Sequence, residues 1–355
     1  MSGRSSYRIA AIPGDGIGRE VLPAARTVID AAAAAGGVEL SYETFDWSCE
    51  RYLAEGAMMP PDALEQLRAF DAIFLGAVGD PRVADHVSLW GLLIPIRQRF
   101  RQYVNLRPIR VFDGLPSPAR AAAEHPVDIV VVRENVEGEY TELGGRFNRG
   151  FPDEQAVQEA VFTRAGVTRI VDYAFDIAAT RSSRLTSATK SNGIVHTLVF
   201  WDEIVAERAA LHPGVGVKSE LIDALCAKLV LQPQSFDVIV ASNLFGDILA
   251  DVAAAVAGSI GIAPSANLNP ERDFPSMFEP VHGSAPDIAG QGIANPIGAI
   301  WAGAMMLDHL GHPDAATSIV DAITRVLAHS DVRTPDLGGR AGTAEFTREI
   351  RDACQ

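Results

Sequence analysis

Residues 7–35 read YRIAAIPGDGIGREVLPAARTVIDAAAAA, and this stretch shows how the chain is built. Residues 7–12 form an apolar run typical of a buried strand, and PGDGIG at 13–18 reads as a turn. Residues 19–35 have the composition of a helix, which Gly36 and Gly37 would end. The sequence therefore opens with a strand, a tight turn and a helix.

The same alternation continues along the chain and predicts an α/β fold. Further strands are expected at 38–45, 71–77, 128–133, 185–190, 215–219 and 236–241, with helices at 196–211, 221–231 and 244–257. Two segments break the pattern. Residues 138–152 are rich in Gly and polar residues and read as a projecting arm, and residues 258–286, with five prolines, read as a long functional loop.

Composition narrows the class of protein. A chain of 355 residues is longer than one compact domain usually grows, so two lobes are expected. There is no signal peptide pattern and no apolar run of the ~20 residues that span a bilayer. Three widely spaced cysteines favour reduced thiols in a cytoplasmic protein. A net charge of −15 argues against nucleic acid as the main partner.

Asp247 and Asp251 lie in NLFGDILAD at 243–251, which follows an expected strand and opens an expected helix. Residues four apart on a helix share a face, with Cβ atoms about 5–6 Å apart. The pair could ligate Mg²⁺ or Mn²⁺, which prefer carboxylate oxygens. It could equally be a helix-capping acid beside an exposed acid. Spacing alone leaves both interpretations open.

Arginines crowd the segment 97–110, and another ends the apolar strand at 128–133. Arginine pairs bidentately with carboxylates, so Arg97, Arg107 and Arg133 could converge on a dicarboxylate. Arg99 and Arg101 are adequately explained as a solvated basic face. The acidic chain would then concentrate its positive charge where an acidic substrate binds.

Tyr140 and Lys190 are candidate proton-transfer groups. Lys190 ends an expected strand, and a lysine near a metal and arginines would have a lowered pKa suited to a base or proton relay. Taken alone, a lysine in a turn is usually solvated, and a tyrosine in a Gly-rich arm is usually a packing residue. Local sequence therefore supports neither role by itself.

Two segments could bind a nucleotide cofactor. The turn at 14–18 reads GxGxG and lacks the GxGxxG of a Rossmann fold. EPVHGSAPDIAG at 279–290 offers small residues, an imidazole and an acid. Asp287 could accept hydrogen bonds from a ribose and would repel a 2′-phosphate, which favours NAD over NADP.

Together these motifs resemble the family of β-decarboxylating dehydrogenases, which includes isocitrate, isopropylmalate, homoisocitrate and tartrate or D-malate dehydrogenases. The matching pieces are IPGDGIG at 12–18, NLRP at 105–108, REN-EGEY at 133–140, TKSNG at 189–193, NLFGDILAD and EPVHGSAPDIAG. The resemblance covers essentially the whole chain and looks closest to the tartrate/D-malate branch. It implies a two-lobed, open mixed sheet with flanking helices that is not a Rossmann fold.

The resemblance also implies domains and roles. Residues 1–102 with 258–355 would form a large cofactor-binding domain, and residues 103–257 a small domain carrying the arm at about 138–152. Lys190 and Asp223 would cross from the partner subunit of a homodimer. The substrate would be bound by Arg97, Arg107, Arg133, Trp90 and Leu93; the metal by Asp223, Asp247 and Asp251; and NAD by Asp15, Gly16, Ile17, Glu279, His282, Gly283, Ser284, Ala285, Asp287, Ile288 and Asn295. Lys190 would relay the hydroxyl proton, and Tyr140 would protonate the enol left by decarboxylation.

The substrate is the least constrained feature. Isopropylmalate enzymes typically carry a Glu seven residues before the first arginine, where this chain has Trp90, and Pro95 interrupts the same segment. D-malate and tartrate are therefore expected, with 3-isopropylmalate as the alternative. A non-catalytic NAD-binding regulatory subunit would have lost some of Tyr140, Lys190, Asp223, Asp247 and Asp251, all of which are present. Whether K⁺ is also required, and whether dimers pair further, stays open.

Overall fold

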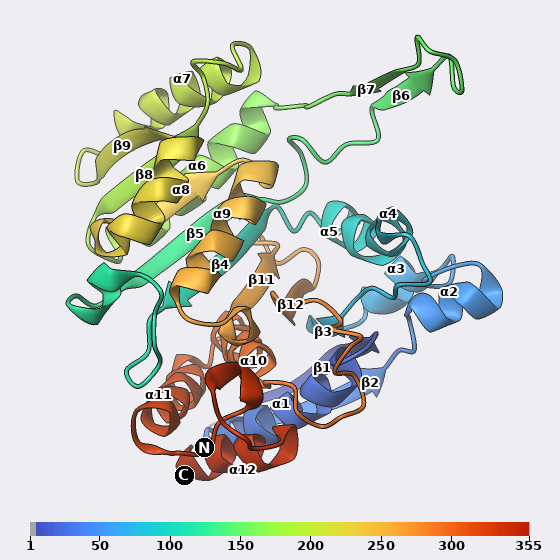
Figure 1. Ribbon diagram of the computed structural model, residues 1–355, viewed down its shortest axis with the longest axis vertical. Coiled ribbons are helices and arrows are strands. Elements are labelled where there is room, and N and C mark those ends of the chain that lie inside the picture. The colour runs from blue at the N-terminus through green and yellow to red at the C-terminus, as the bar shows by residue number, and fades with distance from the viewer. Residues whose placement is uncertain (1–4, 355) are drawn as a thin grey trace. The chain divides into compact units, whose positions relative to one another are not determined.

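The computed structural model describes residues 5–354, which divide into two compact units (Figure 1). The first unit comprises residues up to 102, 110–118 and those from 257 onward, and the second comprises 103–109 and 119–256. No helix in the described range is both long and apolar enough to cross a membrane. Its three cysteines are all free.

The first unit contains five strands in the order β2-β1-β3-β12-β11. Their bounds are β1 (Ser5–Gly14), β2 (Val38–Thr44), β3 (Ala72–Ala77), β11 (Pro264–Leu268) and β12 (Ser276–Pro280). Neighbours are parallel except β11 and β12, which are antiparallel, so the sheet is mixed. Ile9, Ala10, Ala11 and Ile12 are all fully buried, although successive side chains face opposite sides. Both faces of β1 are therefore covered.

Helices cover both faces of this unit. One set is α1 (Gly18–Ala35), α10 (Ile297–His309), α11 (Pro313–His329) and α12 (Thr343–Ala353), which pack on one another. Ala10 and Ile12 face a second core with Trp47, Met58 and Phe100. Around it lie α2 (Cys49–Glu55), α3 (Ala63–Leu67), α4 (Asp85–Ser88), the π-helical turn η1 (Leu89–Leu93) and α5 (Ile94–Arg99), with short 3₁₀ turns η4 (Ile260–Ile262) and η5 (Pro335–Leu337) elsewhere in the unit.

The second unit has strands in the order β4-β5-β10-β8-β9. They are β4 (Val104–Arg110), β5 (Asp128–Glu134), β8 (Arg184–Thr189), β9 (Gly216–Leu221) and β10 (Val238–Ala241), and β5, β10, β8 and β9 run parallel. Helix α6 (Arg164–Ala179) packs on α7 (Thr197–Ala209), and α8 (Ile222–Leu231) packs on α9 (Asn243–Val256). The 3₁₀ turns η2 (Arg120–Ala123) and η3 (Pro233–Ser235) complete it.

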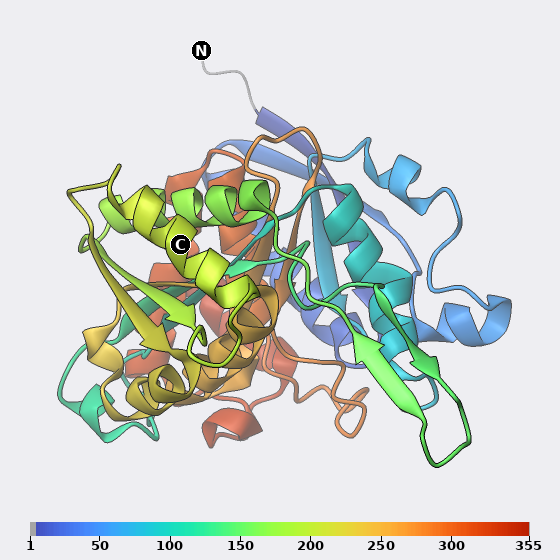
Figure 2. The same cartoon turned by 90° about the horizontal axis from the view of Figure 1, so that it is seen from above.

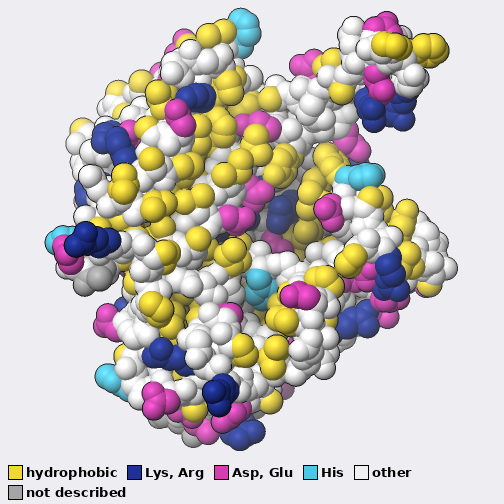
Figure 3. Space-filling view, viewed as in Figure 1, with side chains coloured by type: hydrophobic (Ala, Val, Ile, Leu, Met, Phe, Trp, Pro, Cys, Tyr) yellow, Lys and Arg dark blue, Asp and Glu magenta, His cyan; other side chains and the backbone are white. Residues whose placement is uncertain are grey.

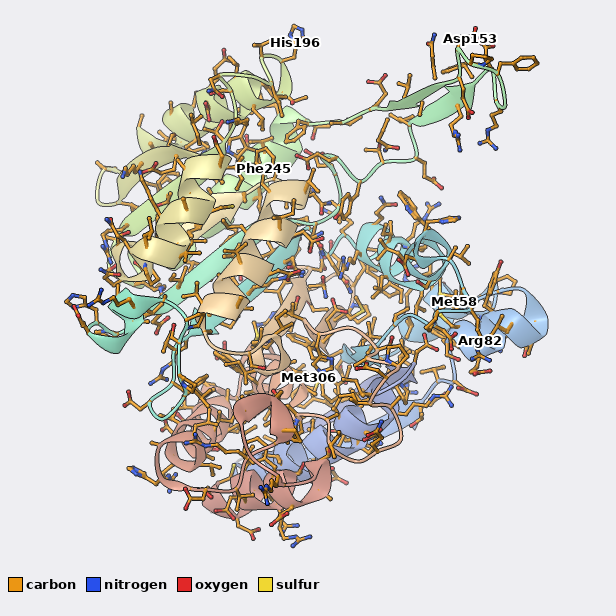
Figure 4. All side chains as sticks on the ribbon, in the orientation of Figure 1. Met58, Arg82, Asp153, His196, Phe245 and Met306 are labelled. Carbon is orange, nitrogen blue, oxygen red and sulfur yellow. The ribbon has the colours of Figure 1, made fainter. Side chains whose placement is uncertain are left out.

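A two-stranded arm, β6 (Gly144–Phe147) paired with β7 (Gln155–Gln158), projects from the second unit (Figures 1 and 2). Asp153 lies at its tip (Figure 4) and accepts a hydrogen bond from Asn148, 2.8 Å long, across the turn. The predicted arm ended at 152, which was too early. Its second strand lies at 155–158, where residues exposed on both faces gave no hydrophobic pattern to read.

The prediction of an irregular loop at 258–286 was wrong. This segment holds two buried antiparallel strands, β11 and β12. Pro264 and Pro280 sit at a strand's first and last residue, and Pro270 and Pro275 lie in the connection between them. Because prolines are tolerated at those places, they mark the ends of the strands and do not exclude them. The other predicted strands and helices are confirmed to within about two residues, a difference usual at element ends.

Candidate active site

Asp247 and Asp251 lie one turn apart on α9, which begins just after β10 ends. Two arginines of the same unit face them. Oδ1 of Asp247 lies 3.1 Å from Nη2 of Arg107 and also accepts a hydrogen bond from Nη1 of Arg133. Oδ1 of Asp251 lies 3.5 Å from Nη1 of Arg107. The guanidinium groups therefore offset the repulsion that two carboxylates at this spacing would suffer.

Arg107 on β4 and Arg133 on β5 are both buried, at 7% and 1% exposure. A buried guanidinium needs acceptors for its N–H groups. Asn105 accepts from Nε of Arg107 at 2.8 Å, and Asn243 accepts from Nε and Nη2 of Arg133 at 3.1 and 2.7 Å. These contacts fix both guanidinium groups, and Arg133 lies next to the last residue of β5, at the carboxyl end of a strand, where α/β proteins place ligands.

The carboxylates are suited to a divalent cation. Burial is the main cause that raises the pKa of Asp251, with neighbouring Asp247 adding to it and Arg107 opposing it. A bound cation would favour the ionised form. Oxygen donors from two carboxylates are the ligand type that Mg²⁺ and Mn²⁺ prefer. Among residues 5–354, no group of three His, Cys, Asp or Glu side chains gathers at one point.

Tyr140 belongs to the same group. Its hydroxyl donates a 2.8 Å hydrogen bond to Oδ2 of Asp247. The guanidinium carbon of Arg133 lies 5.6 Å from the centre of its ring, within the range of a cation–π contact. A phenol held this way can deliver a proton to a ligand beside Asp247.

Lys190 and Asp223 form a separate pair in the second unit. Nζ of Lys190 donates to Oδ1 of Asp223 at 2.7 Å, and this hydrogen bond is the main cause that lowers the pKa of Asp223. Lys190 directly follows β8, and Asp223 lies in the first turn of α8. The two residues that the family resemblance assigned to a partner subunit are thus brought together with each other.

In the first unit, Arg97 on α5 is buried against β12. Its Nη2 donates to Oε1 of Glu279 at 2.8 Å, and the same oxygen accepts from Asn267 at 2.7 Å. Nε of Arg97 is buried with no hydrogen-bond partner among the described residues. Part of this guanidinium is therefore still unsatisfied. Trp90 and Leu93, the expected specificity residues, are half-buried in the π-helical turn η1 that precedes Pro95.

The turn at 14–18 contacts the loop that carries Ser284. The backbone N–H of Ile17 donates to the Ser284 carbonyl at 2.8 Å, and a Cβ on Gly16 would lie 2.0 Å from that oxygen. Only glycine fits there. The buried carboxylate of Asp15 accepts from the backbone N–H groups of Cys49 and Gly79, at 2.9 and 3.0 Å. Asp15 thus holds the turn in place.

The predicted nucleotide loop has groups that a ligand could satisfy. His282 is partly exposed, but its Nε2 atom is enclosed and has no partner among residues 5–354, and burial lowers the pKa of the ring. Asp287 is exposed, and Gly283 has open space around it, as do Gly290 and Gly292. Ser284 is buried, Ala285 has a positive φ of 40°, and Ile288 is half-buried. These features fit a cradle that approaches a nucleotide closely.

Asn295 has a different environment from the other residues that are expected to bind NAD. Its side chain donates to Asp336 at 2.9 Å and accepts from the backbone N–H of Ile297 at 3.0 Å. Both polar atoms are thus engaged at the start of α10.

Sequence reasoning named five residues that the second unit assembles: Arg107, Arg133, Tyr140, Asp247 and Asp251. It missed Asn105 and Asn243, which hold the arginines. Each lies within a quoted motif, NLRP or NLFGDILAD. The available signal was that a buried arginine requires a nearby acceptor.

Comparisons with known proteins identify a family, close relatives and a similar solved structure. The pattern of the isocitrate/isopropylmalate dehydrogenase family matches residues 8–352. The chain is 57% identical to D-malate dehydrogenase (decarboxylating) of Escherichia coli strain K12, over 97% of this chain and 98% of the relative. It is 54% identical to tartrate dehydrogenase/decarboxylase of Pseudomonas putida, over 98% and 97%. The crystal structure of isocitrate dehydrogenase from Methylococcus capsulatus is 37% identical, with a TM-score of 0.88 over 98% of this chain and 99% of that one.

Proposed function

The chain belongs to the isocitrate/isopropylmalate dehydrogenase family, and from this premise we propose that it oxidises and decarboxylates D-malate and tartrate with NAD and a divalent metal. The fold prediction is confirmed: this is the isocitrate dehydrogenase-like fold. The observation that carries the proposal is the convergence of Arg107, Arg133 and Tyr140 on Asp247. Two fixed guanidinium groups, a phenol and a carboxylate pair are what a metal-assisted reaction of a small dicarboxylate requires.

Each residue has a role in this proposal. Arg107 and Arg133 bind a substrate carboxylate and the C2 hydroxyl, and Arg97 is proposed to bind carboxylate too. Asp247 and Asp251 would hold Mg²⁺ or Mn²⁺, and the bound cation would supply Lewis-acid chemistry at the C2 oxygen. Trp90 and Leu93 select the substituent at C3.

Proton transfers are assigned to Lys190 and Tyr140. Lys190 takes the proton of the C2 hydroxyl as hydride leaves C2. The bond from C3 to the β-carboxylate then breaks and releases CO₂; its electron pair forms the C2=C3 double bond, and the C2 carbonyl electrons move onto the C2 oxygen to give an enolate. Tyr140 donates a proton to C3 of that enolate, which restores the C2 ketone.

The nucleotide is proposed to bind along the 279–295 loop and the turn at 14–18. NAD supplies the hydride acceptor when bound. The exposed carboxylate of Asp287 supports NAD over NADP, because it would accept from a ribose hydroxyl and repel a 2′-phosphate. The unsatisfied Nε2 of His282 supports a ligand at this loop.

A homodimer is part of the proposal, with Lys190 and Asp223 of one subunit completing the site of the other. Hydrophobic side chains gather over α8 and α9 (Figure 3), and Val230, Leu231 and Ile248 there are exposed. Such surface usually becomes buried in an interface. Asp223 and Asp247 lie on these two helices, so an interface here would bring carboxylates of two chains toward each other.

The substrate is tested by steady-state kinetics with NAD and Mn²⁺ on D-malate, L-tartrate, meso-tartrate and 3-isopropylmalate. We expect kcat/KM for D-malate or a tartrate to exceed that for 3-isopropylmalate by at least about tenfold, since one or a few added methylenes change binding by about 1–3 kcal/mol. Efficient turnover of 3-isopropylmalate alone would refute the substrate assignment.

Metal removal tests the mechanism separately. EDTA should abolish turnover, and Mn²⁺ should restore it. Turnover that persists in EDTA would indicate a metal-free dehydrogenase, and no turnover with any of the four acids would favour a regulatory subunit.

A further inference from the structure

Asn243, the first residue of α9, is buried at 2% exposure, and both the oxygen and the nitrogen of its side-chain amide form hydrogen bonds. Its Oδ1 accepts two hydrogen bonds from the Arg133 guanidinium, at 3.1 and 2.7 Å. Its Nδ2 donates to the backbone carbonyl of Glu137 at 3.0 Å. Arginine has only donors and a carbonyl only accepts, so the orientation of the amide is fixed.

These bonds close a ring. Arg133 and Tyr140 both donate to the carboxylate of Asp247, one to each oxygen. The backbone runs from Arg133 through Glu137 to Tyr140, and the Asn243 amide bridges Arg133 to Glu137 midway along that path. The two groups proposed to bind substrate and to donate a proton are therefore linked through one side chain.

The chain between Arg133 and Tyr140 is fitted closely to the start of α9. Gly138 has φ +98°, and a Cβ there would lie 3.3 Å from Cβ of Asn243. The Glu139 carboxylate accepts from the Ser242 hydroxyl at 2.7 Å and from the Leu244 backbone N–H at 3.0 Å. Glu137 through its backbone carbonyl, and Glu139 through its side chain, thus attach the chain on each side of Gly138 to residues 242–244.

We propose that Asn243 is a positioning residue for the reaction: through Oδ1 it orients the Arg133 guanidinium, and through Nδ2 it holds the backbone that presents the Tyr140 hydroxyl. The inference rests on the proposed function for what Arg133 and Tyr140 do. The new element is that two atoms of one amide have separate effects: Oδ1 positions the group that binds substrate, and Nδ2 positions the group that donates the proton.

Two substitutions separate these atoms. Asn243→Asp keeps an acceptor for Arg133 but removes the donor to Glu137, so at saturating Mn²⁺ we expect KM within about threefold of the wild type. Its kcat should fall about 10- to 100-fold, the range for losing a hydrogen bond in a charged, buried network. Asn243→Ala removes both contacts, so KM should also rise about 10- to 100-fold.

Ser182→Ala is the matched control for stability. It removes a hydroxyl that donates to Asp237, beside the opposite end of β10 from α9. It should lower the melting temperature and leave kcat and KM unchanged. Equal losses of kcat in this control and in Asn243→Asp would show that Asn243 acts only through stability, and would overturn the proposal.

A measurement that does not depend on turnover tests the role of Asn243 separately from the proposed function. Hydrogen exchange of the Arg133 Nε–H is followed by ¹⁵N NMR of the full-length, ligand-free protein, with the signal identified by its absence in Arg133→Lys. Asn243→Ala should speed exchange at least about tenfold, since this proton loses its acceptor, whereas Asn243→Asp should not. If the wild type turns over no 2-hydroxy dicarboxylate, the proposed function fails but this measurement still reports on Asn243. Unchanged exchange in Asn243→Ala would overturn the positioning role.

Discussion

At the end of β5, Glu134 follows Arg133 and is buried, at 1% exposure. Burial is the main cause that raises the pKa of its carboxyl group to about 7 from 4.5, opposed by Arg169, whose Nη2 lies 3.7 Å away. Its Oε1 accepts from the backbone N–H groups of Val136 and Glu137, at 2.9 and 3.2 Å. Glu134 therefore shapes the turn that leads toward Tyr140.

This raised pKa predicts a pH dependence of stability. Between pH 4.5 and about 7 the unfolded chain has released the Glu134 proton and the folded chain has kept it. The folded state then binds more protons, so its stability falls as pH rises through this window. The loss is about 3 kcal/mol, at roughly 1.4 kcal/mol for each pH unit.

Glu134→Gln should remove this dependence, because the amide keeps an oxygen for the two N–H groups and does not ionise. Urea unfolding of both proteins at pH 5 and pH 8 measures it. The free energy of unfolding of the variant, relative to that of the wild type, should be higher at pH 8 than at pH 5. All other titrating groups are common to both proteins and cancel in this comparison. An equal difference at the two pH values would contradict the prediction.

Gly246 is required for α9 to approach Arg133. A Cβ on Gly246 would lie 2.6 Å from Cβ and 2.7 Å from Cγ of Arg133, near the stiff base of that side chain. Gly246→Ala gains about 1 kcal/mol of helix propensity but costs roughly 1–3 kcal/mol in overpacking, so stability should change little or fall. KM for the dicarboxylate should rise at least about tenfold, as misplaced binding groups cost this much or more.

Gly303→Ala is a matched control on α10 of the first unit. There the added Cβ would meet the far end of the Ile29 side chain. This variant should lose stability with KM unchanged. A wild-type KM in Gly246→Ala would show that the Arg133 guanidinium tolerates the shift.

At the scale of elements, the arm presents one apolar face. Val157 pairs with Gly145, which lies between Leu143 and Phe147 along the chain. Alternate residues of a strand share a face, so these three exposed hydrophobic side chains lie together. A two-stranded ribbon is marginally stable alone, and this face is suited to cover by a second copy of the chain.

The double variant Leu143→Asp with Phe147→Asp should therefore weaken the proposed dimer, since two buried charges would replace apolar contacts. Sedimentation velocity at micromolar concentration should show a shift from dimer toward monomer, with unchanged far-UV circular dichroism. Arg149→Ala, at the exposed tip, is the control expected to stay dimeric. A double variant as dimeric as this control would exclude the arm from the interface.

At the scale of the whole molecule, the proposal that Lys190 acts across subunits can be tested by mixing two inactive variants. Lys190→Ala and Asp247→Asn should each lose nearly all turnover. In a mixed dimer, one site would combine intact Asp247 from one chain with intact Lys190 from the other. After random exchange, half the dimers are mixed and have one competent site of two, so about a quarter of wild-type activity should return.

The control mixes Lys190→Ala with Lys190→Ala,Asp247→Asn, which share the Lys190 defect and should regain nothing. Recovery confined to the first mixture supports sites shared between chains. No recovery there, with subunit exchange verified by differential tagging, would place Lys190 in the site of its own chain.

The sequence by itself determined the α/β class, most elements and the family. Apolar runs, Gly-rich turns and helix ends are local signals, and long ordered motifs such as NLFGDILAD are specific. It also named Arg107, Arg133, Asp247 and Asp251 from their charge and spacing along the chain, and Tyr140 through the family resemblance.

Only the tertiary structure decided how these groups are held. The strands at 264–268 and 276–280 were missed because both of their faces are buried, which removes the alternation that sequence reading depends on. Asn243 orients Arg133 although 110 positions separate them, and Lys190 pairs with Asp223 across 33. Hydrogen bonds act over about 3 Å, and only the folded backbone brings such distant residues within that range.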